Sequence, residues 1–417
     1  MSNIKIFPSP LCGKVTLPAS KSVAHRVLIC AALAEGKSVI EPFCTSRDIE
    51  ATAGALKALG AEIVSSENGY TVNGITLQNR AVLNCVESGS TARFLLPVAA
   101  ALGVNATFVG EGRLPERPFD DLCNVLRENG VKCDGNNLPL DISGLFSGEK
   151  FTFPGNVSSQ YISGVLLAAP LMKRDVFVEI KGKLESEPYV QMTVAVMKQF
   201  GVVVEKQKDG YFVRGGQKYV SRDVKIEADW SAAAFFMSAA TIGGEIAIDG
   251  LNFASTQGDM AALDVFAAFG AEISITDNTL LIKRGKTLRG ISVNAEQIPD
   301  MVPAIAATAA FAQGETKITG AARLRLKESD RISTVCNALK AMGVQVIEGA
   351  DSITVKGGTV QGGMVDGAND HRIVMAFAIA AAYAQNQSEI THKEAISKSY
   401  PEFFRDFQKL GGKVNEF

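Results

Sequence analysis

The sequence has a single tryptophan, no Cys-x-x-Cys pair and no block of residues with like charge. A formal net charge of −2 and an aromatic content of 7% argue against the basic, base-stacking surface of a nucleic-acid-binding protein. No apolar run reaches the ~18 residues of a membrane span, and residues 1–7 lack the pattern of a signal or transit peptide. We therefore expect a cytoplasmic protein that binds neither nucleic acid nor membranes.

The cysteines show no arrangement typical of a metal site or a disulfide framework. They are odd in number, and no histidine stands at metal-ligand spacing from any of them. The seven are Cys12, Cys30, Cys44, Cys85, Cys123, Cys133 and Cys336. Also absent are a GxxxxGK(S/T) loop, a GxGxxG motif after a strand and a Ser-His-Asp elbow, so nucleotide hydrolysis and dinucleotide chemistry are not predicted.

What the chain does contain is a repeat of about seventy residues. Amphipathic helices are followed by glycines that are spaced by 68 to 73 residues, namely Gly60, Gly130, Gly201, Gly270, Gly343 and Gly411. Each glycine suits the left-handed position that closes a helix before a strand. A second helix, apolar nearly all round and therefore buried, recurs at residues 27–34, 94–102, 165–171, 232–240, 304–312 and 373–384.

Six copies at a constant period indicate an internal repeat. We interpret each copy as strand, buried helix, strand, surface helix, strand, strand. Because 417 residues are too many for one core, six units predict two lobes of three, each with three buried parallel helices. The sixth copy ends one strand short, and residues 4–7 supply a spare strand that would complete it. We therefore assign residues 19–222 to one lobe, and residues 1–18 with 223–417 to the other.

Polar residues open all six buried helices, and capping accounts for only some of them. Ser, Asp and Asn are preferred caps, which explains Ser88, Ser158 and Asp229, and Ser20 could cap the first helix. Long or cationic side chains at a helix start make sense if an anion binds there. Such residues are Lys21, Arg26, Gln160, His371 and Arg372. Two lobes whose parallel helices begin at facing ends would form an interlobe cleft with positive potential, suited to small polyanions.

Further cation-rich loops would line the same cleft, at residues 111–118, 183–189, 323–331 and 398–401. Arg offers a fixed fork for carboxylate or phosphate, and Lys offers a point charge. A carboxylate buried among such cations, such as Asp300 or Glu328, could exchange a proton with a substrate. The plainer alternatives are a surface helix that happens to begin with Lys21, and an ordinary solvated helix start with local ion pairs at residues 327–331.

With these motifs in order, the chain resembles the 5-enolpyruvylshikimate-3-phosphate synthase family over essentially its whole length. The motifs are Leu17-Pro-Ala-Ser-Lys-Ser-Val-Ala-His-Arg26, Ser88-Gly-Ser-Thr-Ala-Arg93, Glu116-Arg-Pro118, Ser158-Ser-Gln160, Ile298-Pro-Asp300, Lys327-Glu-Ser-Asp-Arg331, Asn369-Asp-His-Arg372 and Lys398-Ser-Tyr-Pro401. The resemblance implies a two-lobed inside-out α/β barrel of six βαβαββ units, whose lobes close around the substrates. It also implies transfer of the carboxyvinyl group of phosphoenolpyruvate to the 5-hydroxyl of shikimate-3-phosphate, through a tetrahedral intermediate and without metal or cofactor.

The resemblance further implies a role for each matching residue. Shikimate-3-phosphate would be bound by Lys21, Ser22, Arg26, Ser158, Ser159, Gln160, Ser186, Tyr189, Asp300 and Lys327. Phosphoenolpyruvate would be bound by Lys21, Gly89, Arg117, Gln160, Arg331, Arg372 and Lys398. Asp300 would accept the 5-hydroxyl proton, Glu328 with Lys21 would move protons at the methylene carbon, and His371 would support them. We expect a monomer that acts in chorismate and aromatic amino acid biosynthesis.

Three residues depart from the commoner family pattern. Glu87 stands where many members have Asn, Ser90 where many have Thr, and Arg323 where Asn is common. These changes bear on substrate affinity and on the response to the herbicide glyphosate, and we expect Arg93 or another cation to pair with Glu87.

Two alternative functions stay open. One is the related transferase that acts on UDP-N-acetylglucosamine, most members of which carry a Cys where residues 105–122 have none. The other is a non-catalytic anion-binding repeat protein, which would need neither Asp300 nor Glu328.

Overall fold

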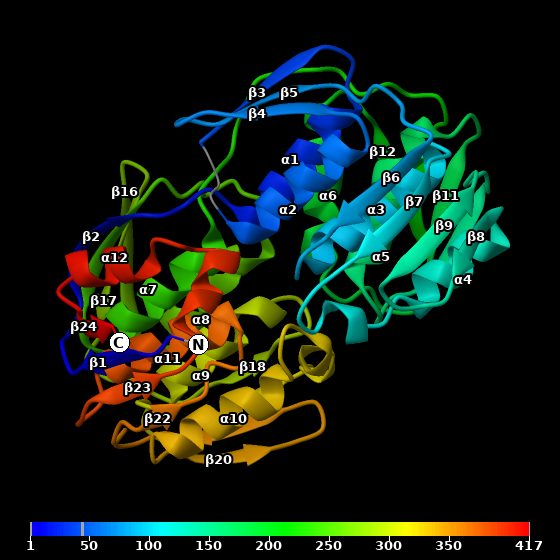
Figure 1. Ribbon diagram of the computed structural model, residues 1–417. Helices are drawn as coiled ribbons and strands as arrows, with labels where there is room; N and C mark the ends of the chain where they lie inside the picture. Colours follow the sequence, from blue (N-terminus) through cyan, green and yellow to red (C-terminus); the bar gives the residue numbers. More distant parts are fainter. Residues whose placement is uncertain (1, 43–45, 417) are drawn as a thin grey trace. The chain divides into compact units, whose positions relative to one another are not determined.

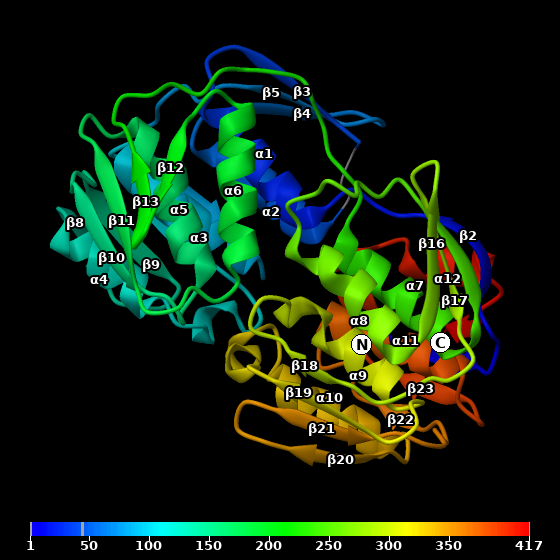
Figure 2. The same cartoon turned by 180° about the vertical axis from the view of Figure 1, so that it is seen from behind.

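The structure is a computed structural model that describes residues 2–42 and 46–416 (Figures 1 and 2). Cys44 lies outside the described residues. The chain divides into two compact units, which we call unit 1 and unit 2. Unit 1 comprises Met1–Pro18 and Glu227–Phe417, and unit 2 comprises Ala19–Ile226.

Unit 2 contains three four-stranded sheets and the first six α-helices. The sheets are formed by β14 (Val224–Lys225), β3 (Lys37–Glu41), β5 (Tyr70–Asn73) and β4 (Glu62–Ser65); by β6 (Arg80–Asn84), β7 (Asn105–Val109), β9 (Leu140–Gly144) and β8 (Val131–Asp134); and by β10 (Lys150–Pro154), β11 (Val176–Lys181), β13 (Gly210–Val213) and β12 (Val204–Gln207). The helices are α1 (Lys21–Leu33), α2 (Arg47–Ala58), α3 (Gly89–Ala101), α4 (Asp120–Glu128), α5 (Ser159–Ala168) and α6 (Glu187–Gln199), with short 3-10 turns η1 (Leu114–Glu116) and η2 (Ala169–Leu171).

Unit 1 repeats this plan with three more sheets. They are formed by β2 (Cys12–Thr16), β15 (Glu245–Asp249), β17 (Thr279–Arg284) and β16 (Ala271–Thr276); by β18 (Ser292–Asn294), β19 (Glu315–Thr319), β21 (Ile353–Lys356) and β20 (Gln345–Glu348); and by β22 (Met364–Val365), β23 (Ser388–Ile390), β1 (Ile4–Phe7) and β24 (Lys413–Glu416). The helices are α7 (Trp230–Gly243), α8 (Ala262–Phe269), α9 (Val302–Ala309), α10 (Arg331–Ala341), α11 (His371–Ala382) and α12 (Phe403–Lys409), with 3-10 turns η3 (Gly258–Ala261), η4 (Pro299–Met301), η5 (Ala322–Leu326) and η6 (Lys393–Lys398).

The predicted α/β class with six strand–helix repeats is confirmed. In each unit the sheets lie on the outside of the apolar helices (Figures 1 and 2). In the second repeat, for example, β6 and β7 pair in parallel across α3, whereas β8 and β9 pair antiparallel. A parallel pair needs such a crossover, and the crossing helix is the one that becomes buried. Each unit has its own apolar core, and the chain's only tryptophan, Trp230, is fully buried in that of unit 1.

The first strands of the first and fourth repeats are exchanged between the units. β2 precedes α1 in the chain but pairs in parallel with β15, while β14 precedes α7 but pairs in parallel with β3. Residues 223–226, which the sequence analysis assigned to the other lobe, therefore lie in unit 2. β1 pairs with both β23 and β24, so the N-terminal strand completes the sixth sheet as inferred.

The repeat glycines close their helices as predicted. Gly60, Gly130, Gly201, Gly270, Gly343 and Gly411 have φ between +82° and +108°. A side chain is strained in this region, which explains why glycine recurs at this point of each repeat. Of the helices that the structure describes, none is both long and apolar enough to cross a bilayer.

Candidate active site

Hydrogen bonds at the starts of the buried helices confirm three predicted caps. The side chains of Ser88, Ser158 and Asp229 accept from backbone N–H groups in the first turns of α3, α5 and α7. Asp370 does the same for α11. The expected cap at Ser20 is wrong, because this fully buried residue makes no cap hydrogen bond with α1.

Lys21 is the first residue of α1, and its ammonium group pairs with Asp48 in the first turn of α2. The distance from Nζ to Asp48 Oδ2 is 2.8 Å, and only 13% and 12% of the two side chains are exposed. The sequence did not single out Asp48, since an acidic residue in a first turn is an ordinary complement to the helix dipole. The pair holds the Lys21 ammonium group at a helix start, where free N–H groups favour an anion.

The Arg26 guanidinium is buried within unit 2 and holds α1 to α6. Its Nε donates to Thr193 Oγ1 at 2.7 Å, and its Nη2 donates to the Tyr189 carbonyl at 2.9 Å. Its Nη1 donates to the Ser22 carbonyl at 2.7 Å. Burial lowers the pKa of Arg26 to about 10, so the group stays charged at neutral pH. Arg26 thereby fixes the backbone at two residues expected to bind shikimate-3-phosphate.

The starts of α3 and α5 carry a second group of predicted residues. We call Gly89, Ser90, Arg93, Arg117 and Gln160 the unit 2 cluster. Gln160 Oε1 accepts from Arg93 Nη1 at 3.0 Å, and Gln160 Nε2 donates to Ser90 Oγ at 2.9 Å, which fixes the orientation of the amide. A Cβ on Gly89 would lie 2.8 Å from Nη1 of both Arg93 and Arg117. The glycine therefore lets two guanidinium groups converge beside a helix start.

Arg117 is the strongest indication of an anion site in unit 2. Only 7% of the residue is exposed, and its buried Nε makes no hydrogen bond. Among the described residues no carboxylate forms an ion pair with it. A buried cation without a counter-ion is unfavourable. An anion bound beside Gly89 would supply the missing partner.

We expect Gly89→Ala to raise the KM for phosphoenolpyruvate about tenfold. The new methyl group would displace the guanidinium groups of Arg93 and Arg117, and small displacements of binding groups weaken substrate binding by this order of magnitude. The atoms that the new Cβ meets are the ends of flexible arginine side chains, so the fold should be kept. Steady-state kinetics with each substrate varied in turn measures the effect, and the KM for shikimate-3-phosphate should change little. Gly54→Ala is the matched control, because Gly54 is an exposed residue of α2 and a Cβ there would meet nothing within 4 Å. Equal kinetics for both variants would contradict the expectation.

Three more of the residues expected to bind shikimate-3-phosphate, Ser158, Ser159 and Ser186, lie at helix starts of unit 2. Ser158 and Ser159 begin α5, and Ser159 is buried. Ser186 precedes α6 and is buried with φ of +53°, a left-handed conformation that is unusual for serine. Such strain is typical of functional sites.

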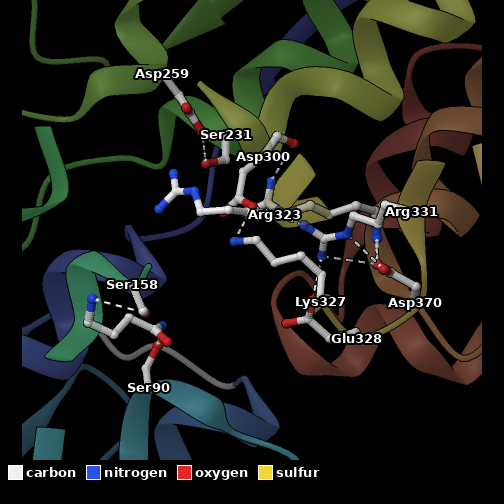
Figure 3. A network of polar contacts seen from close by, with 12 residues as sticks. Ser90, Ser158, Ser231, Asp259, Asp300, Arg323, Lys327, Glu328, Arg331 and Asp370 are labelled. Carbon is white, nitrogen blue, oxygen red and sulfur yellow. Dashed lines mark hydrogen bonds and ion pairs between the residues drawn. The ribbon is translucent and has the colours of Figure 1, made fainter. Parts of the chain in front are cut away.

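Asp300 is the centre of the corresponding group in unit 1 (Figure 3). We call Asp300, Lys327, Glu328, Arg331 and Arg372 the unit 1 cluster. Asp300 lies in η4, Arg331 begins α10 and Arg372 is in the first turn of α11. Arg331 Nη1 and Lys327 Nζ lie 2.9 and 3.3 Å from Asp300 Oδ1, and Arg372 Nη2 lies 3.0 Å from Asp300 Oδ2. One carboxylate thus contacts three cations from different elements.

Arg331 in turn contacts three carboxylates, although only 1% of its side chain is exposed. Its Nε lies 2.8 Å from Asp370 Oδ2, and its Nη2 lies 2.7 Å from Glu328 Oε2 (Figure 3). Burial acts to lower the pKa of Arg331, but Asp370, Glu328 and Asp300 together raise it above its ordinary value. Arg331 therefore fixes both candidate proton carriers relative to one another.

The cations also set the ionisation of Asp300. Burial acts to raise its pKa, but Arg372, Lys327 and Arg331 hold the pKa well below its ordinary value. Burial lowers the pKa of Lys327, and the charge of Asp300 opposes that shift. Asp300 is thus ionised at neutral pH, and its low pKa makes it a weak base in the substrate-free protein.

His371 is the first residue of α11, and Lys398 at the end of η6 contacts the residues before that helix. Lys398 is 3% exposed, and its Nζ donates to the Asn369 carbonyl at 2.6 Å. His371 is buried, with Nδ1 3.9 Å from Asp370 Oδ1. Both predicted residues are therefore at or in contact with the start of α11, which also carries Arg372 of the unit 1 cluster.

Asp259 in η3 is a buried carboxylate that the sequence analysis missed. Its Oδ2 accepts a hydrogen bond from Ser231 Oγ at the start of α7, while its Oδ1 is buried without a hydrogen bond (Figure 3). Burial and the negative charge of Asp300 raise the pKa of Asp259 to about 6. No motif marks it, because Gly-Asp before a helix is typical of an ordinary helix start.

We expect Asp259→Asn to stabilise unit 1 at neutral pH, because it removes a buried charge. A carboxyl whose folded pKa is raised destabilises the fold above that pKa, and this effect disappears as the pH falls through about 6 to the unfolded value near ~4. As the pH falls over that interval, the free energy of unfolding of wild type should therefore rise by roughly 2 to 3 kcal/mol relative to that of the variant.

Urea unfolding followed by the fluorescence of Trp230 measures this difference, since the only tryptophan reports on unit 1. Asp264→Asn, on the exposed face of α8, is the control and should show no such trend. If wild type and Asp259→Asn differed in their free energy of unfolding by the same amount at every pH, the expectation would be contradicted.

The three departures from the family pattern, Glu87, Ser90 and Arg323, have partners in the structure, and Ser90 Oγ accepts from Gln160 Nε2 as described above. Arg47 Nη1 lies 3.8 Å from Glu87 Oε1, so the cation beside Glu87 is Arg47. Arg93 contacts Gln160 and the Pro118 carbonyl. Arg323 Nη2 donates to the Glu296 carbonyl at 3.3 Å.

Comparisons with known proteins assign the chain to a family. The family model of EPSP synthase (3-phosphoshikimate 1-carboxyvinyltransferase) matches residues 7–407. The chain belongs to the EPSP synthase family. The 3-phosphoshikimate 1-carboxyvinyltransferases of Clostridium novyi and Clostridium acetobutylicum are each 39% identical to it, over 100% of this chain and 99% of each relative.

Solved structures agree with the EPSP synthase assignment. EPSP synthase from Acinetobacter baumannii matches with a TM-score of 0.83 and 26% identity, over 100% of both chains. The enolpyruvyl transferase NikO from Streptomyces tendae matches with a TM-score of 0.81 at 17% identity, which shows the fold alone.

Membership in the EPSP synthase family confirms the enzyme class and the reaction that the motifs predicted. The chain transfers the carboxyvinyl group of phosphoenolpyruvate to shikimate-3-phosphate in aromatic amino acid biosynthesis. Within residues 2–42 and 46–416, no three His, Cys, Asp or Glu side chains gather as a metal site would require. The cation-rich clusters of both units fit substrates that carry phosphate and carboxylate groups.

Proposed function

We propose that the unit 1 and unit 2 clusters serve one reaction, in which the 5-hydroxyl of shikimate-3-phosphate adds to phosphoenolpyruvate and phosphate then leaves. The observation that carries this proposal is Asp300, a single carboxylate held by Lys327, Arg331 and Arg372. It combines a proton acceptor with groups that bind anions. The reaction takes place in a cleft between the units, when their closure brings both clusters to the same substrates.

The residues of the two units bind the two substrates as the family motifs imply. Phosphoenolpyruvate binds to Lys21, Gly89, Arg117, Gln160, Arg331, Arg372 and Lys398. Shikimate-3-phosphate binds to Lys21, Ser22, Arg26, Ser158, Ser159, Gln160, Ser186, Tyr189, Asp300 and Lys327. Support for this division comes from Arg117, whose buried guanidinium has no carboxylate partner among the described residues.

Substrate binding makes Asp300 a better base. In the substrate-free protein three cations stabilise its charge and depress its pKa. Phosphoenolpyruvate brings phosphate and carboxylate oxygens to Arg331 and Arg372, which then share their charge between substrate and Asp300. The pKa of Asp300 rises as a result, and the 5-hydroxyl proton passes to it while the hydroxyl oxygen bonds to C2 of phosphoenolpyruvate.

Glu328 and Lys21 act at the methylene carbon. During addition a proton is delivered to C3, which completes the tetrahedral intermediate. During elimination C3 loses a proton while the bond from C2 to the phosphate oxygen breaks, and the enol ether remains. Arg331 holds Glu328 Oε2 at 2.7 Å, which positions the carboxylate for both steps. The surrounding cations stabilise the charge that develops on the departing phosphate.

Phosphate release from phosphoenolpyruvate tests the proposal. We expect release that depends strictly on shikimate-3-phosphate, with the enol ether product formed in equal amount. UDP-N-acetylglucosamine is the control acceptor and should support no release. Release with that acceptor and none with shikimate-3-phosphate would overturn the proposal, and no release with either would favour a non-catalytic anion-binding protein.

We also expect the two substrates together to make the protein more compact. Both are anions that repel one another in solution, and holding them in contact while excluding water requires closure of the units. Small-angle scattering should show a smaller radius of gyration with both substrates than with phosphoenolpyruvate alone. An unchanged radius would contradict closure. The same data give the molecular mass and test the predicted monomer, while the cytoplasmic location stays a prediction.

A further inference from the structure

Four buried polar side chains form a chain of hydrogen bonds across helices α1, α2 and α3 of unit 2. They are His25 on α1, Thr52 on α2, and Ser88 and Thr91 at the start of α3. His25 Nδ1 lies 2.7 Å from Thr52 Oγ1, and Thr52 Oγ1 lies 2.6 Å from Thr91 Oγ1. Thr91 Oγ1 donates to Ser88 Oγ at 2.7 Å. Helix α2 packs against both α1 and α3, so one of its threonines can contact side chains of both (Figure 1).

One end of this hydrogen-bond chain lies directly beneath the ion pair of Lys21 and Asp48. His25 follows Lys21 by four residues on α1, and Thr52 follows Asp48 by four residues on α2. Residues four apart lie on the same face of a helix. The contact between His25 and Thr52 therefore repeats, one turn deeper, the contact between Lys21 and Asp48. The two contacts together fix the starts of α1 and α2 against one another.

The other end reaches the first residue of α3. Ser88 Oγ accepts from the Thr91 N–H at 3.2 Å as well as from the Thr91 hydroxyl group. Gly89 is the next residue, and it is expected to bind phosphoenolpyruvate beside Arg117. The hydrogen bonds therefore connect the Lys21 end of the expected phosphoenolpyruvate site to its Gly89 end, within one unit.

We propose that His25, Thr52 and Thr91 are positioning residues for phosphoenolpyruvate, because their hydrogen-bond chain fixes the start of α3 relative to the starts of α1 and α2. This inference rests on the proposed function, in which Lys21 and Gly89 bind that substrate. The three residues act through Lys21 and Gly89, and they place the two groups at the separation that the substrate requires.

The hydroxyl groups give the hydrogen-bond chain a direction. Each threonine has a single proton to donate. Thr91 gives its proton to Ser88, so the short contact between Thr91 and Thr52 uses the proton of Thr52. Thr52 then has no proton left for the imidazole, and His25 Nδ1 must donate to Thr52 Oγ1. The network thus assigns the His25 tautomer that carries its proton on Nδ1.

The surroundings of His25 keep it in this neutral form. Its Nε2 is buried and makes no hydrogen bond, so a second proton would create an unpaired buried N–H group. Burial, with the charges of Lys21 and Arg26, holds the pKa of His25 well below its ordinary value. The ring meets Phe94 of α3 edge to face, with 6.4 Å between the centroids. A neutral donor at one end and a helix cap at the other leave the hydrogen-bond chain one arrangement, as a positioning role requires.

Thr52→Val tests this role, because valine keeps the shape of threonine but can neither donate nor accept a hydrogen bond. We expect the KM for phosphoenolpyruvate to rise about tenfold and the KM for shikimate-3-phosphate to change less than about twofold. Most of the residues expected to bind shikimate-3-phosphate in unit 2 lie on or before α1, α5 and α6. Thr52→Ser keeps the hydroxyl group and should restore the KM of wild type. Thr91→Val is the second variant, and it should resemble Thr52→Val.

Thr308→Val is the matched control. Thr308 is a fully buried threonine on α9 of unit 1, and its Oγ1 lies 2.7 Å from Ser238 Oγ on α7. This variant also removes a contact between hydroxyl groups on two buried helices, but neither residue is expected to bind a substrate. Both KM values should equal those of wild type. If Thr308→Val raised the KM for phosphoenolpyruvate as much as Thr52→Val does, general destabilisation would explain the effect and the proposal would be overturned.

NMR of the histidine ring nitrogens in isotope-labelled protein tests the hydrogen-bond chain without substrate. The chain has three histidines, so the His25 signals are those that disappear in His25→Asn. We expect a protonated Nδ1 and an unprotonated Nε2 in wild type and in Thr308→Val, and altered shifts of both nitrogens in Thr52→Val. A proton on Nε2 at neutral pH, or wild-type kinetics in Thr52→Val, would overturn the proposal. Wild type that lacks transferase activity would contradict the proposed function, and the ring shifts would still decide whether the hydrogen-bond chain exists.

Discussion

Asp300→Asn should lower kcat about a thousandfold, the range expected when a general base is removed. The amide has the size of the carboxylate, but it cannot accept the 5-hydroxyl proton at neutral pH. The KM for phosphoenolpyruvate should not rise, because the carboxylate that competes with the substrate for Arg331 and Arg372 is gone. A loss confined to kcat is the mark of a group that acts in the transition state.

Steady-state kinetics and circular dichroism of the variant measure this result, with Asp264→Asn on the exposed face of α8 as a carboxylate-to-amide control. The pH dependence gives a second measure. The pKa of Asp300 in the free protein is well below its ordinary value. The acid limb of kcat in wild type reports the loaded enzyme and should lie at higher pH, because the substrates share the cations. A variant with more than about a tenth of wild-type kcat would exclude Asp300 as the base.

The repeat and the helix starts could be predicted because their causes are local. A glycine with positive φ must close each outer helix, so Gly60 and its five counterparts mark the period directly. Ser88 and Ser158 cap their helices through atoms two or three residues away, and such bonds depend little on the rest of the fold. The motif residues Asp300 and Arg331 could be placed for the same reason, since each stands at the start of an element.

Strand pairing could not be predicted in the same way. The assignment of residues 1–18 placed β2 in the correct unit, but residues 223–226, which contain β14, were assigned to that same unit and lie in unit 2. The structure exchanges them, with β2 beside β15 and β14 beside β3. Pairing between strands about two hundred residues apart depends on tertiary packing, which a local pattern does not contain.

Partnerships between distant polar residues were also missed. Asp48 pairs with Lys21 and Asp259 accepts from Ser231, yet Asp48 and Asp259 each resemble ordinary helix-start residues in the sequence.

Arg331→Met should destabilise unit 1 by roughly 3 to 5 kcal/mol, the usual result of removing one partner from a buried ionic network. The guanidinium joins Asp370, Glu328 and Asp300, and methionine would leave these carboxylates facing one another in a buried site. Arg331→Lys should recover only part of the loss, because an ammonium group cannot reproduce the fork that contacts all three.

Urea unfolding monitored by Trp230 fluorescence measures this loss, because the tryptophan lies in the core of unit 1. Arg325→Met is the matched control. Arg325 also bridges two carboxylates, Asp330 and Glu348, but 30% of its side chain is exposed. Arg325→Met should lower the free energy of unfolding by no more than about 1 kcal/mol. Equal losses for the two variants would contradict the special role of Arg331.

The difference in free energy of unfolding between wild type and Arg331→Met should become smaller as the pH is lowered. In wild type the folded pKa of Asp300 lies well below its unfolded value, so its contribution to stability is complete above about 4 and is lost as the pH falls further. Removal of Arg331 takes away one of the cations that produce this contribution. In the variant, low pH protonates the carboxylates left without that partner and relieves their repulsion. If the difference in free energy of unfolding between wild type and Arg331→Met stayed constant from neutral pH to about 3, Arg331 would stabilise unit 1 by packing alone.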